Sequence, residues 1–360
     1  MLTKKNEVLY SLGDVTIIPG ESTTILHRSQ CDPFTKSIEG KENYYPVIAA
    51  PMASVISPEN YKLFHEQGIS CIIPRNIPLE KRKKLCMEVM CAFSLNEVEE
   101  NFINNKYSLL GDKLHILIDI ANGHMVKEIA IGKTLKELYG DNVILMGGNI
   151  ANPQTYLLYN DAGFDFLRLG IGGGSQCITS TQLGVHYPMA SLIGDTVELM
   201  RDKGIYFDKG RTKIIADGGI NSFSDAIKCL ALGADYIMMG KVFAKAKEAC
   251  GDTFVMYDEK SGNPRTYRRY YGMSTKRAQA EILGYNTIEE AKKDTIKLKT
   301  AEGRSEDLLI EYTLQGWVEN FDSYLRSAMS YTGSAYLSTF PIRAEVRIIS
   351  SLSGTLINSK

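Results

Sequence analysis

Eight short apolar runs alternate with amphipathic stretches along this 360-residue chain, and this alternation restricts the fold more than any other feature. Most of the runs are continuous and rich in Ile, Val and Leu, which is typical of strands covered on both faces. The pattern therefore predicts a parallel sheet with helices between its strands. The predicted strands span residues 47–50, 70–73, 89–93, 115–118, 143–146, 164–169, 213–216 and 236–239.

Helical patterns fill the gaps between these runs. The clearest lies at 222–232, where Ser222 is the expected N-cap and Gly233 the expected stop. Asn96 is the expected N-cap of an earlier helix, and Thr287 with Glu290 has the spacing of a capping box. The predicted helices lie at 78–88, 96–104, 126–138, 154–161 and 222–232, within 282–299, and at 314–329.

Eight strands with interleaved helices predict an α/β fold, a (β/α)8 TIM barrel that forms one domain over residues 1–360. An open, doubly wound sheet is the alternative. We favour the barrel because ligand-type residues follow many of the strands, and in a barrel they all meet at one face.

Two regions break the alternation. The stretch at about 251–306 is polar, charged and too long for an ordinary connection, so we expect a mobile flap over the active face. A solvated helical excursion is the alternative. The last twenty or so residues, from Leu337 onward, are expected to form a C-terminal tail that packs on a neighbouring subunit.

Composition excludes several classes of protein. With 44% hydrophobic and 23% charged residues and a formal net charge of −1, the chain has no basic field that would indicate nucleic acid or a membrane surface. The first residues contain no apolar leader, and no stretch has the roughly 18 apolar residues of a membrane helix. The seven cysteines form no CxxC pair, which favours a reducing, cytoplasmic location.

One glycine-rich loop carries the strongest chemical signal. Gly170 and three consecutive glycines, 172–174, precede Cys177, and Thr179 follows. The loop leaves the end of a predicted strand, where α/β folds place their chemistry, and a cysteine there is a candidate nucleophile. Glycines allow backbone groups to close on a ligand or ion. A turn with a packed, inert cysteine is the alternative.

A phosphate site is predicted after the last two strands, because barrels often bind phosphate at these loops. Asp217, Gly218 and Gly219 follow the seventh run, and Gly240 follows the eighth. Asp217 would accept hydrogen bonds from a ribose diol. The alternative is that Asp217 caps the next helix and the glycines only make the turn.

Three further polar residues are candidates for the site. Glu302, on the closing part of the flap, would act on Thr179, with a surface glutamate as the alternative. Asn122 and Asn149 follow neighbouring strands, and either would hold a loop or read a base edge. A purely structural role for both amides is equally compatible with the sequence.

Five motifs, in order along the chain, resemble the IMP dehydrogenase / GMP reductase family. They are Ile118-Asp-Ile-Ala-Asn-Gly123, Gly170-Ile-Gly-Gly-Gly-Ser-Gln-Cys-Ile-Thr179, Ile215-Ala-Asp-Gly-Gly-Ile220, Met238-Met-Gly240 and Tyr271-Gly-Met-Ser274. The segment from Asp14 to Thr23 also resembles the family's opening. The resemblance implies a (β/α)8 barrel, usually a homotetramer, that acts on a purine nucleoside monophosphate with a nicotinamide dinucleotide.

The resemblance also implies roles for individual residues. Cys177 would be the nucleophile at purine C2, with Thr179 and Glu302 assisting proton transfer. The substrate would be surrounded by Met52, Ser175, Asp217, Gly218, Gly219, Gly240, Lys241, Tyr271, Gly272, Met273 and Ser274. The cofactor would contact Asp119, Ala121, Asn122 and Gly123. The backbone carbonyls of Gly170, Gly172 and Cys177 match the family's potassium-binding loop.

Within the family, the chain is more similar to the reductase branch. No regulatory module fits between the second and third runs, Glu302 stands where the dehydrogenase often has glutamine, and no Arg-Tyr pair occurs between Ser274 and Glu302. The implied reaction is the reductive deamination of GMP to IMP and ammonia, through a covalent thioimidate on Cys177. The expected reductant is NADPH, with NADH as the alternative.

Two other functions are kept as alternatives. One is an IMP dehydrogenase that lacks the regulatory module. The other is a catalytically weakened purine-nucleotide-binding member of the family. The second is motivated by Ala53, since the family usually has Met-Asp-Thr where this chain has Met52-Ala-Ser54.

Overall fold

The centre of the protein is an eight-stranded, all-parallel sheet in the order β3-β2-β9-β8-β7-β6-β5-β4. The computed structural model describes residues 8–105, 113–174, 179–205, 210–257, 262–300 and 303–350. Its strands are β2 (Val47–Ala49), β3 (Ser70–Cys71), β4 (Cys91–Phe93), β5 (Leu114–Ile118), β6 (Val143–Ile150), β7 (Phe166–Leu169), β8 (Lys213–Asp217) and β9 (Tyr236–Met239).

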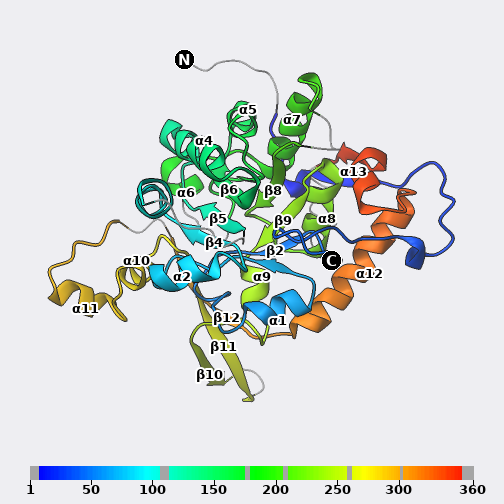
Figure 1. Cartoon of the computed structure of the whole chain (residues 1–360). Helices are drawn as coiled ribbons and strands as arrows, with labels where there is room; N and C mark the ends of the chain where they lie inside the picture. The colour runs from blue at the N-terminus through cyan, green and yellow to red at the C-terminus, as the bar shows by residue number, and fades with distance from the viewer. Residues whose placement is uncertain are drawn as a thin grey trace.

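The two outer strands of this sheet meet and close it into a barrel. Ile73, just after β3, forms a parallel bridge with Cys91 of β4. Its N–H donates to the Met90 carbonyl at 2.9 Å, and its carbonyl accepts from the Ala92 N–H at 2.9 Å. The predicted (β/α)8 barrel is therefore confirmed, and the open sheet is excluded (Figure 1).

Helices on the outside of the barrel follow the strands. They are α1 (Tyr61–Glu66), α2 (Leu79–Leu85), α3 (Leu95–Val98) with the π-helical turn Glu99–Asn104, α4 (Val126–Tyr139), α5 (Pro153–Asp161), α7 (Met189–Asp202), α8 (Phe223–Leu232) and α12 (Leu314–Tyr331). Short helices α6 (Thr179–Leu183) and α9 (Lys241–Ala244) directly follow β7 and β9. Helices α1 and α7 were not predicted from the sequence.

The helix ends show which local signals were correct. Ser222 caps α8, because its hydroxyl accepts from the Asp225 N–H at 3.0 Å, and Gly233 ends the helix with φ +112°. The N-cap of α3 is Ser94 rather than the expected Asn96. Ser94 and Glu97 form a capping box, in which Glu97 accepts from the Ser94 N–H at 2.7 Å.

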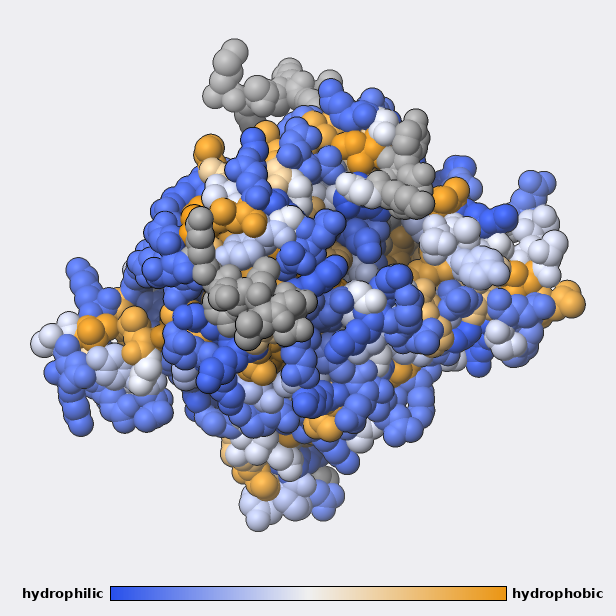
Figure 2. Space-filling view, in the orientation of Figure 1, coloured by the Kyte–Doolittle hydropathy of each residue, from blue (hydrophilic) through white to orange (hydrophobic). Residues whose placement is uncertain are grey.

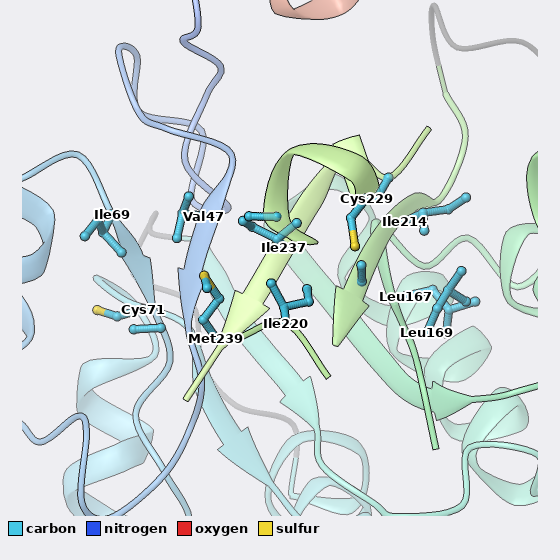
Figure 3. Packing of buried hydrophobic residues seen from close by; sticks show 14 of the residues in the cluster. Val47, Ile69, Cys71, Leu167, Leu169, Ile214, Ile220, Cys229, Ile237 and Met239 are labelled. Carbon is cyan, nitrogen blue, oxygen red and sulfur yellow. The ribbon is translucent and has the colours of Figure 1, made fainter. Parts of the chain in front are cut away.

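Alternate residues of each strand face opposite sides of the barrel wall. Ile48 points into the barrel, whereas Val47 and Ala49 point toward the helices. The interior cluster also contains Ile72, Met90, Ala92, Leu117, Met146, Phe166, Ile215, Tyr236 and Met238. Figure 3 shows part of the outer layer, in which residues of β2, β7, β8 and β9 pack with Cys229 of α8.

The flap contains a sheet that was not predicted. Strands β10 (Thr253–Tyr257), β11 (Pro264–Tyr271) and β12 (Ser305–Leu309) form an antiparallel sheet that projects from the barrel (Figure 1). Helices α10 (Lys276–Ile282) and α11 (Ile288–Lys293) lie between β11 and β12 in the chain. The helix expected within 282–299 is confirmed as α11, with Thr287 as its N-cap.

The C-terminal tail, as far as it is described, folds onto its own chain. After α13 (Phe340–Arg343), strand β13 (Glu345–Ile348) pairs antiparallel with β1 (Val15–Ile18). The expectation of a tail that packs on a neighbouring subunit missed this pairing, because β1 and β13 lie more than 300 residues apart. Short 3₁₀ helices occur at Leu12–Asp14, Arg28–Gln30, Gly140–Asn142 and Leu337–Thr339.

The surface of the molecule is mainly hydrophilic on the face in Figure 2, with separate hydrophobic patches. Val255 and Met256 of the projecting β10 are 59% and 40% exposed. Among the described residues, no helix combines the length and apolar character that crossing a membrane requires.

Candidate active site

A cavity of about 220 Å³ lies at the carboxyl ends of the barrel strands, where the barrel loops meet the flap. Most of the predicted substrate residues line it, although they come from four separate parts of the chain. They are Met52, Asp217, Gly218, Gly219, Gly240, Lys241, Gly272, Met273 and Ser274, and Asp119 joins them from the predicted cofactor loop. The fold thus places these residues together at one site.

Two glycines are required by close approaches around this cavity. Gly170 has φ +132°, and a Cβ there would lie 2.1 Å from the Asp217 carbonyl oxygen. A Cβ at Gly240 would lie 2.6 Å from the Met52 sulfur and 2.7 Å from the Tyr270 hydroxyl oxygen. A side chain at Gly170 would collide with backbone and force the two loops apart, whereas one at Gly240 would displace the Met52 and Tyr270 side chains from the cavity wall.

A buried arginine organises the polar side of the cavity. Arg168 of β7 is 4% exposed and lines the cavity wall. Its Nη2 donates to Asp119 Oδ1 at 2.8 Å and to the Gly148 carbonyl at 2.9 Å, while Nη1 lies 3.7 Å from Asp217 Oδ2. Asn149 Nδ2 donates to the same Asp217 oxygen at 2.7 Å. One guanidinium thus connects the predicted cofactor loop to the predicted ribose-binding carboxylate.

Burial and charge act in opposite directions on these groups. Burial raises the pKa of Asp217, and Arg168 and the Asn149 amide offset this only in part. Burial lowers the pKa of Arg168, but the charges of Asp119 and Asp217 outweigh it, so the pKa ends above its usual value. Arg168 therefore stays charged and supplies the positive charge that the two partly buried carboxylates need.

The predicted cofactor loop reaches the cavity only through Asp119. The Asn122 side chain accepts from the His124 N–H at 3.2 Å, and both Ala121 and Asn122 are exposed outside the cavity lining. The Gly123 N–H donates to the Asn149 carbonyl at 2.8 Å and holds the loop against β6. Asn149 thus joins this loop to Asp217.

Arg75, after β3, lies beside this loop and was not predicted. Its Nη1 donates to the Asp119 carbonyl at 3.5 Å. Its Nε is buried and has no acceptor among the described residues. A guanidinium at the carboxyl edge of the barrel is nevertheless of the kind that binds anions such as phosphate.

The flap closes the other side of the cavity. Gly272, Met273, Ser274 and Gly303 line it, and the Gly272 N–H donates to the Arg304 carbonyl at 3.1 Å. The outgoing and returning parts of the flap therefore meet at the cavity, as a lid would require.

One predicted residue of the flap points elsewhere. The Tyr271 hydroxyl donates to Glu281 at 2.9 Å, and the Arg277 guanidinium lies 4.8 Å from the ring centroid. Tyr270 instead lines the cavity, and its hydroxyl lies 3.2 Å from the Met52 sulfur. The sequence has three aromatic residues near this point, and strand alternation decides which one faces the site.

Lys241 joins the barrel edge to the flap. It lines the cavity after β9, and its Nζ lies 2.8 Å from Glu306 of β12. One turn further on, Lys245 makes a similar pair with Glu311 at 2.9 Å, but it lies outside the cavity lining. A cation at the end of β9 agrees with the predicted phosphate position.

Comparison with known proteins identifies the family. The family model described as "IMP dehydrogenase / GMP reductase domain" matches residues 9–356. This chain belongs to the IMP dehydrogenase / GMP reductase family. Over 349 residues it is 28% identical to a GMP reductase of Vibrio cholerae, with 92% of each chain covered. It is 27% identical over 368 residues to a GMP reductase of Buchnera aphidicola, covering 99% of this chain and 98% of the relative.

Three residues to which the family resemblance assigns a role fall outside the described parts of the chain. These are the predicted catalytic residues Cys177 and Glu302 and the predicted substrate-binding residue Ser175. Thr179 begins α6, but its side chain is likewise not described. Their roles remain predictions, as does the potassium loop. Of that loop's predicted carbonyls, the one of Gly172 accepts from the Ser180 hydroxyl at 2.9 Å.

The most informative functional residue that sequence reasoning missed is Arg168. It stands inside an apolar run that was interpreted only as a buried strand. A charged residue within a strand covered on both faces is itself a signal, because burial requires a partner of opposite charge. In this family member the partners are Asp119 and Asp217.

Proposed function

We propose that this protein reduces GMP to IMP and ammonia with a nicotinamide dinucleotide as hydride donor. The observation that carries the proposal is the cavity in which Asp217, the glycine turns after β8 and β9, and Lys241 lie opposite the flap residues Gly272 to Ser274. Matches to relatives named GMP reductase over most of the chain support the same activity.

The cavity residues suit a purine nucleoside monophosphate. Asp217 is 19% exposed and accepts from Asn149, and its carboxylate is available to accept hydrogen bonds from a ribose diol. Lys241 and the backbone N–H groups of Gly219 and Gly240 would hold the phosphate. The base would then extend toward the loop of Cys177 and the flap residues Met273 and Ser274.

The proposed chemistry uses Cys177 as a covalent nucleophile. The thiolate adds to purine C2, and the exocyclic amine leaves as ammonia after it gains a proton, with Thr179 and Glu302 assisting. Hydride then adds to C2 of the thioimidate, and loss of the thiolate gives IMP. In total, GMP, NADPH and one proton give IMP, NADP⁺ and ammonia.

The chain's residues fit a dinucleotide beside the purine. Arg75, which lies beside the Asp119 carbonyl, would hold an anionic phosphate through its guanidinium, and Asp119 with Arg168 would border the nicotinamide. A reduced nicotinamide, when bound, supplies the hydride. The flap would exclude water, which otherwise would hydrolyse the covalent intermediate to XMP.

Turnover by the purified protein tests this function directly. With GMP and NADPH, we expect NADPH oxidation with one ammonia released for each IMP formed. Cys177→Ser should abolish turnover and keep GMP binding. Parallel reactions with NADH, and with dGMP or XMP in place of GMP, establish the cofactor and the purine. If IMP with NAD⁺ reacts and GMP with NADPH does not, the protein is an IMP dehydrogenase and the proposal is wrong.

One specific observation motivates the weakened nucleotide-binding alternative. Position 53 is alanine, and the neighbouring Ser54 hydroxyl is buried and without a partner among the described residues. This alternative predicts nucleotide binding with no turnover in either direction.

The family likeness supports four further proposals. They are a single barrel domain without a regulatory module, a homotetramer, a cytoplasmic location, and a potassium ion at the Gly170–Cys177 loop. Light scattering tests the assembly, and activity in potassium against lithium salts tests the cation.

A further inference from the structure

A carboxyl group is buried directly behind the active-site wall. Glu128 lies in the first turn of α4 and is 0% exposed. Its Oε1 accepts from the Gly148 N–H at 3.0 Å. Its Oε2 is buried and has no hydrogen-bond partner among the described residues. A carboxyl in this position is costly for stability, so its presence needs a reason.

The surrounding backbone leaves room for this carboxyl. A Cβ at Gly147 would lie 3.0 Å from Glu128 Oε1 and 2.6 Å from the Tyr159 ring. Tyr159 in turn donates its hydroxyl hydrogen to the Gly123 carbonyl at 2.7 Å. Glu128 and Tyr159 therefore occupy the space beside Gly147 and hold the loop before α4 against the end of β6.

Gly148 connects this carboxyl to the active site. Its N–H is held by Glu128, and its carbonyl accepts from Arg168 Nη2 at 2.9 Å. The same Nη2 donates to Asp119 at 2.8 Å, and Nη1 faces Asp217. A shift of Gly148 would therefore turn the guanidinium that fixes both cavity carboxylates.

We propose that Glu128 is a positioning residue: its negative charge and its hydrogen bond to Gly148 together hold Arg168 in the orientation that places Asp119 and Asp217 for the reaction. This inference rests on the proposed function, because it assigns Glu128 to the same site. Glu128 itself does not line the cavity.

The charge of Glu128 provides a readout of this role. Burial raises its pKa to about 7, against the opposing effects of the Tyr159 hydroxyl, the Gly148 N–H and Arg168, and Asp119 raises it further. These groups face Glu128 from α5, β6, β7 and the end of β5. Because its ionisation changes the field at Arg168, activity should change with it close to neutral pH.

The test compares Glu128→Gln with the wild type across pH. The amide keeps the shape and the acceptor oxygen but removes the charge. We expect kcat to fall about tenfold and KM for GMP to rise a few-fold, because the ribose-binding Asp217 also loses its position. The inflection of kcat near pH 7 should disappear.

Glu97→Gln is the matched control. Like Glu128, Glu97 accepts from a backbone N–H, that of Ser94, and it lies beside a buried arginine, Arg82, with which it forms a direct ion pair at 2.6 Å. Neither residue lines the cavity. Glu97→Gln should keep the wild-type kcat and pH profile. The substitution can lower the stability of the protein, but it does not change the orientation of Arg168.

Two outcomes would overturn the proposal. One is a Glu128→Gln enzyme with the wild-type kcat and inflection. The other is an equal loss of kcat in Glu128→Gln and Glu97→Gln, which would show that the loss does not come from Arg168. If GMP is not reduced at all, the proposed function fails separately. The pH dependence of GMP binding by calorimetry, with and without Glu128→Gln, then tests the positioning of Asp217.

Discussion

The barrel and the flap each supply one side of the cavity, and they hold their charged groups in opposite ways. On the barrel side, the Arg168 side chain is 5% exposed and is bonded to Asp119 and Gly148. On the flap side, Lys241 and Glu306 form a pair whose side chains are 29% and 43% exposed. The first pair is shielded from water, whereas the second is in partial contact with it.

This difference indicates what each side contributes. Separating the partners of a buried pair leaves an uncompensated charge, which is costly. The polar groups on the barrel side are therefore held in place before a ligand binds. An exposed pair contributes little and exchanges readily with water or with a ligand anion. We therefore expect the barrel to supply prearranged geometry and the flap to supply an adjustable cover.

Arg168→Met should produce the largest effect. It leaves Asp119 and Asp217 without their counter-charge, and such a loss costs about 3–5 kcal/mol of unfolding free energy. Urea denaturation measures the stability, and calorimetry measures GMP binding, which should be lost. Arg82→Met, which removes an equally buried arginine away from the cavity, should lower stability but keep binding. A loss below about 1 kcal/mol for Arg168→Met would contradict the buried network.

Glu128→Gln should change how stability depends on pH. The folded protein holds a proton on Glu128 up to about pH 7, whereas an unfolded glutamate loses it near its ordinary pKa. Wild-type stability should therefore decline from about pH 4 to pH 8, by about 3 kcal/mol from this group. The variant should lack this decline, as measured by denaturation at each pH. Equal slopes for the two proteins would show that Glu128 ionises normally.

Arg268→Met should loosen the flap selectively. Arg268 of β11 is 2% exposed and donates to the carbonyls of Ala244 and Ala246 at 2.7 and 2.6 Å, which anchors the flap sheet to the end of α9. Leaving these carbonyls without a donor costs about 1–3 kcal/mol. We expect faster proteolysis within 251–311 and an unchanged barrel.

Arg269→Met is the control for this change. Arg269 is the next residue, but its pair with Asp307 at 3.1 Å is exposed to solvent. Cleavage should remain as slow as in the wild type. Equal cleavage of the two variants would mean that the flap is not anchored through Arg268.

Glu306→Gln should have the smallest effect, because the Lys241–Glu306 pair that it breaks is exposed to solvent. Stability should change by less than about 1 kcal/mol. GMP affinity should rise a few-fold at low salt, because the GMP phosphate no longer competes with the Glu306 carboxylate for Lys241. This gain in affinity should become smaller as the salt concentration increases. Glu311→Gln breaks the equivalent Lys245 pair outside the cavity and should leave GMP affinity unchanged. Identical behaviour of both variants would remove Lys241 from the phosphate site.

The sequence could predict those parts of the fold that depend on local patterns. Each of the eight predicted strands overlaps a strand of the barrel, and Ser222 with Gly233 delimits α8. The predicted Asn96 cap failed because the nearby Ser94 competes for the same helix start and has Glu97 at the right spacing. The flap sheet escaped prediction because β11 pairs with β12 across more than thirty residues that include two helices.

Some residues of the candidate site could likewise be predicted from local sequence patterns, and others could not. Asp217, Gly240 and Lys241 could be found because each directly follows a recognisable strand, and strand ends converge in a barrel. Tyr270 and Tyr271 could not be distinguished, because the choice depends on which face of β11 meets the barrel. Arg75 lacked any local pattern that separates it from other surface arginines.

By itself, the sequence determined the eight strands of a parallel α/β sheet and the strand ends that carry the polar loops, because these follow from periodicity and short-range signals. Only the tertiary structure decided that Arg168 pairs with Asp119, 49 residues before it, and that Glu128 supports this pair through Gly148. The physical reason is that a buried charge is satisfied by whatever group the closed barrel brings within hydrogen-bonding distance, and closure depends on the whole chain.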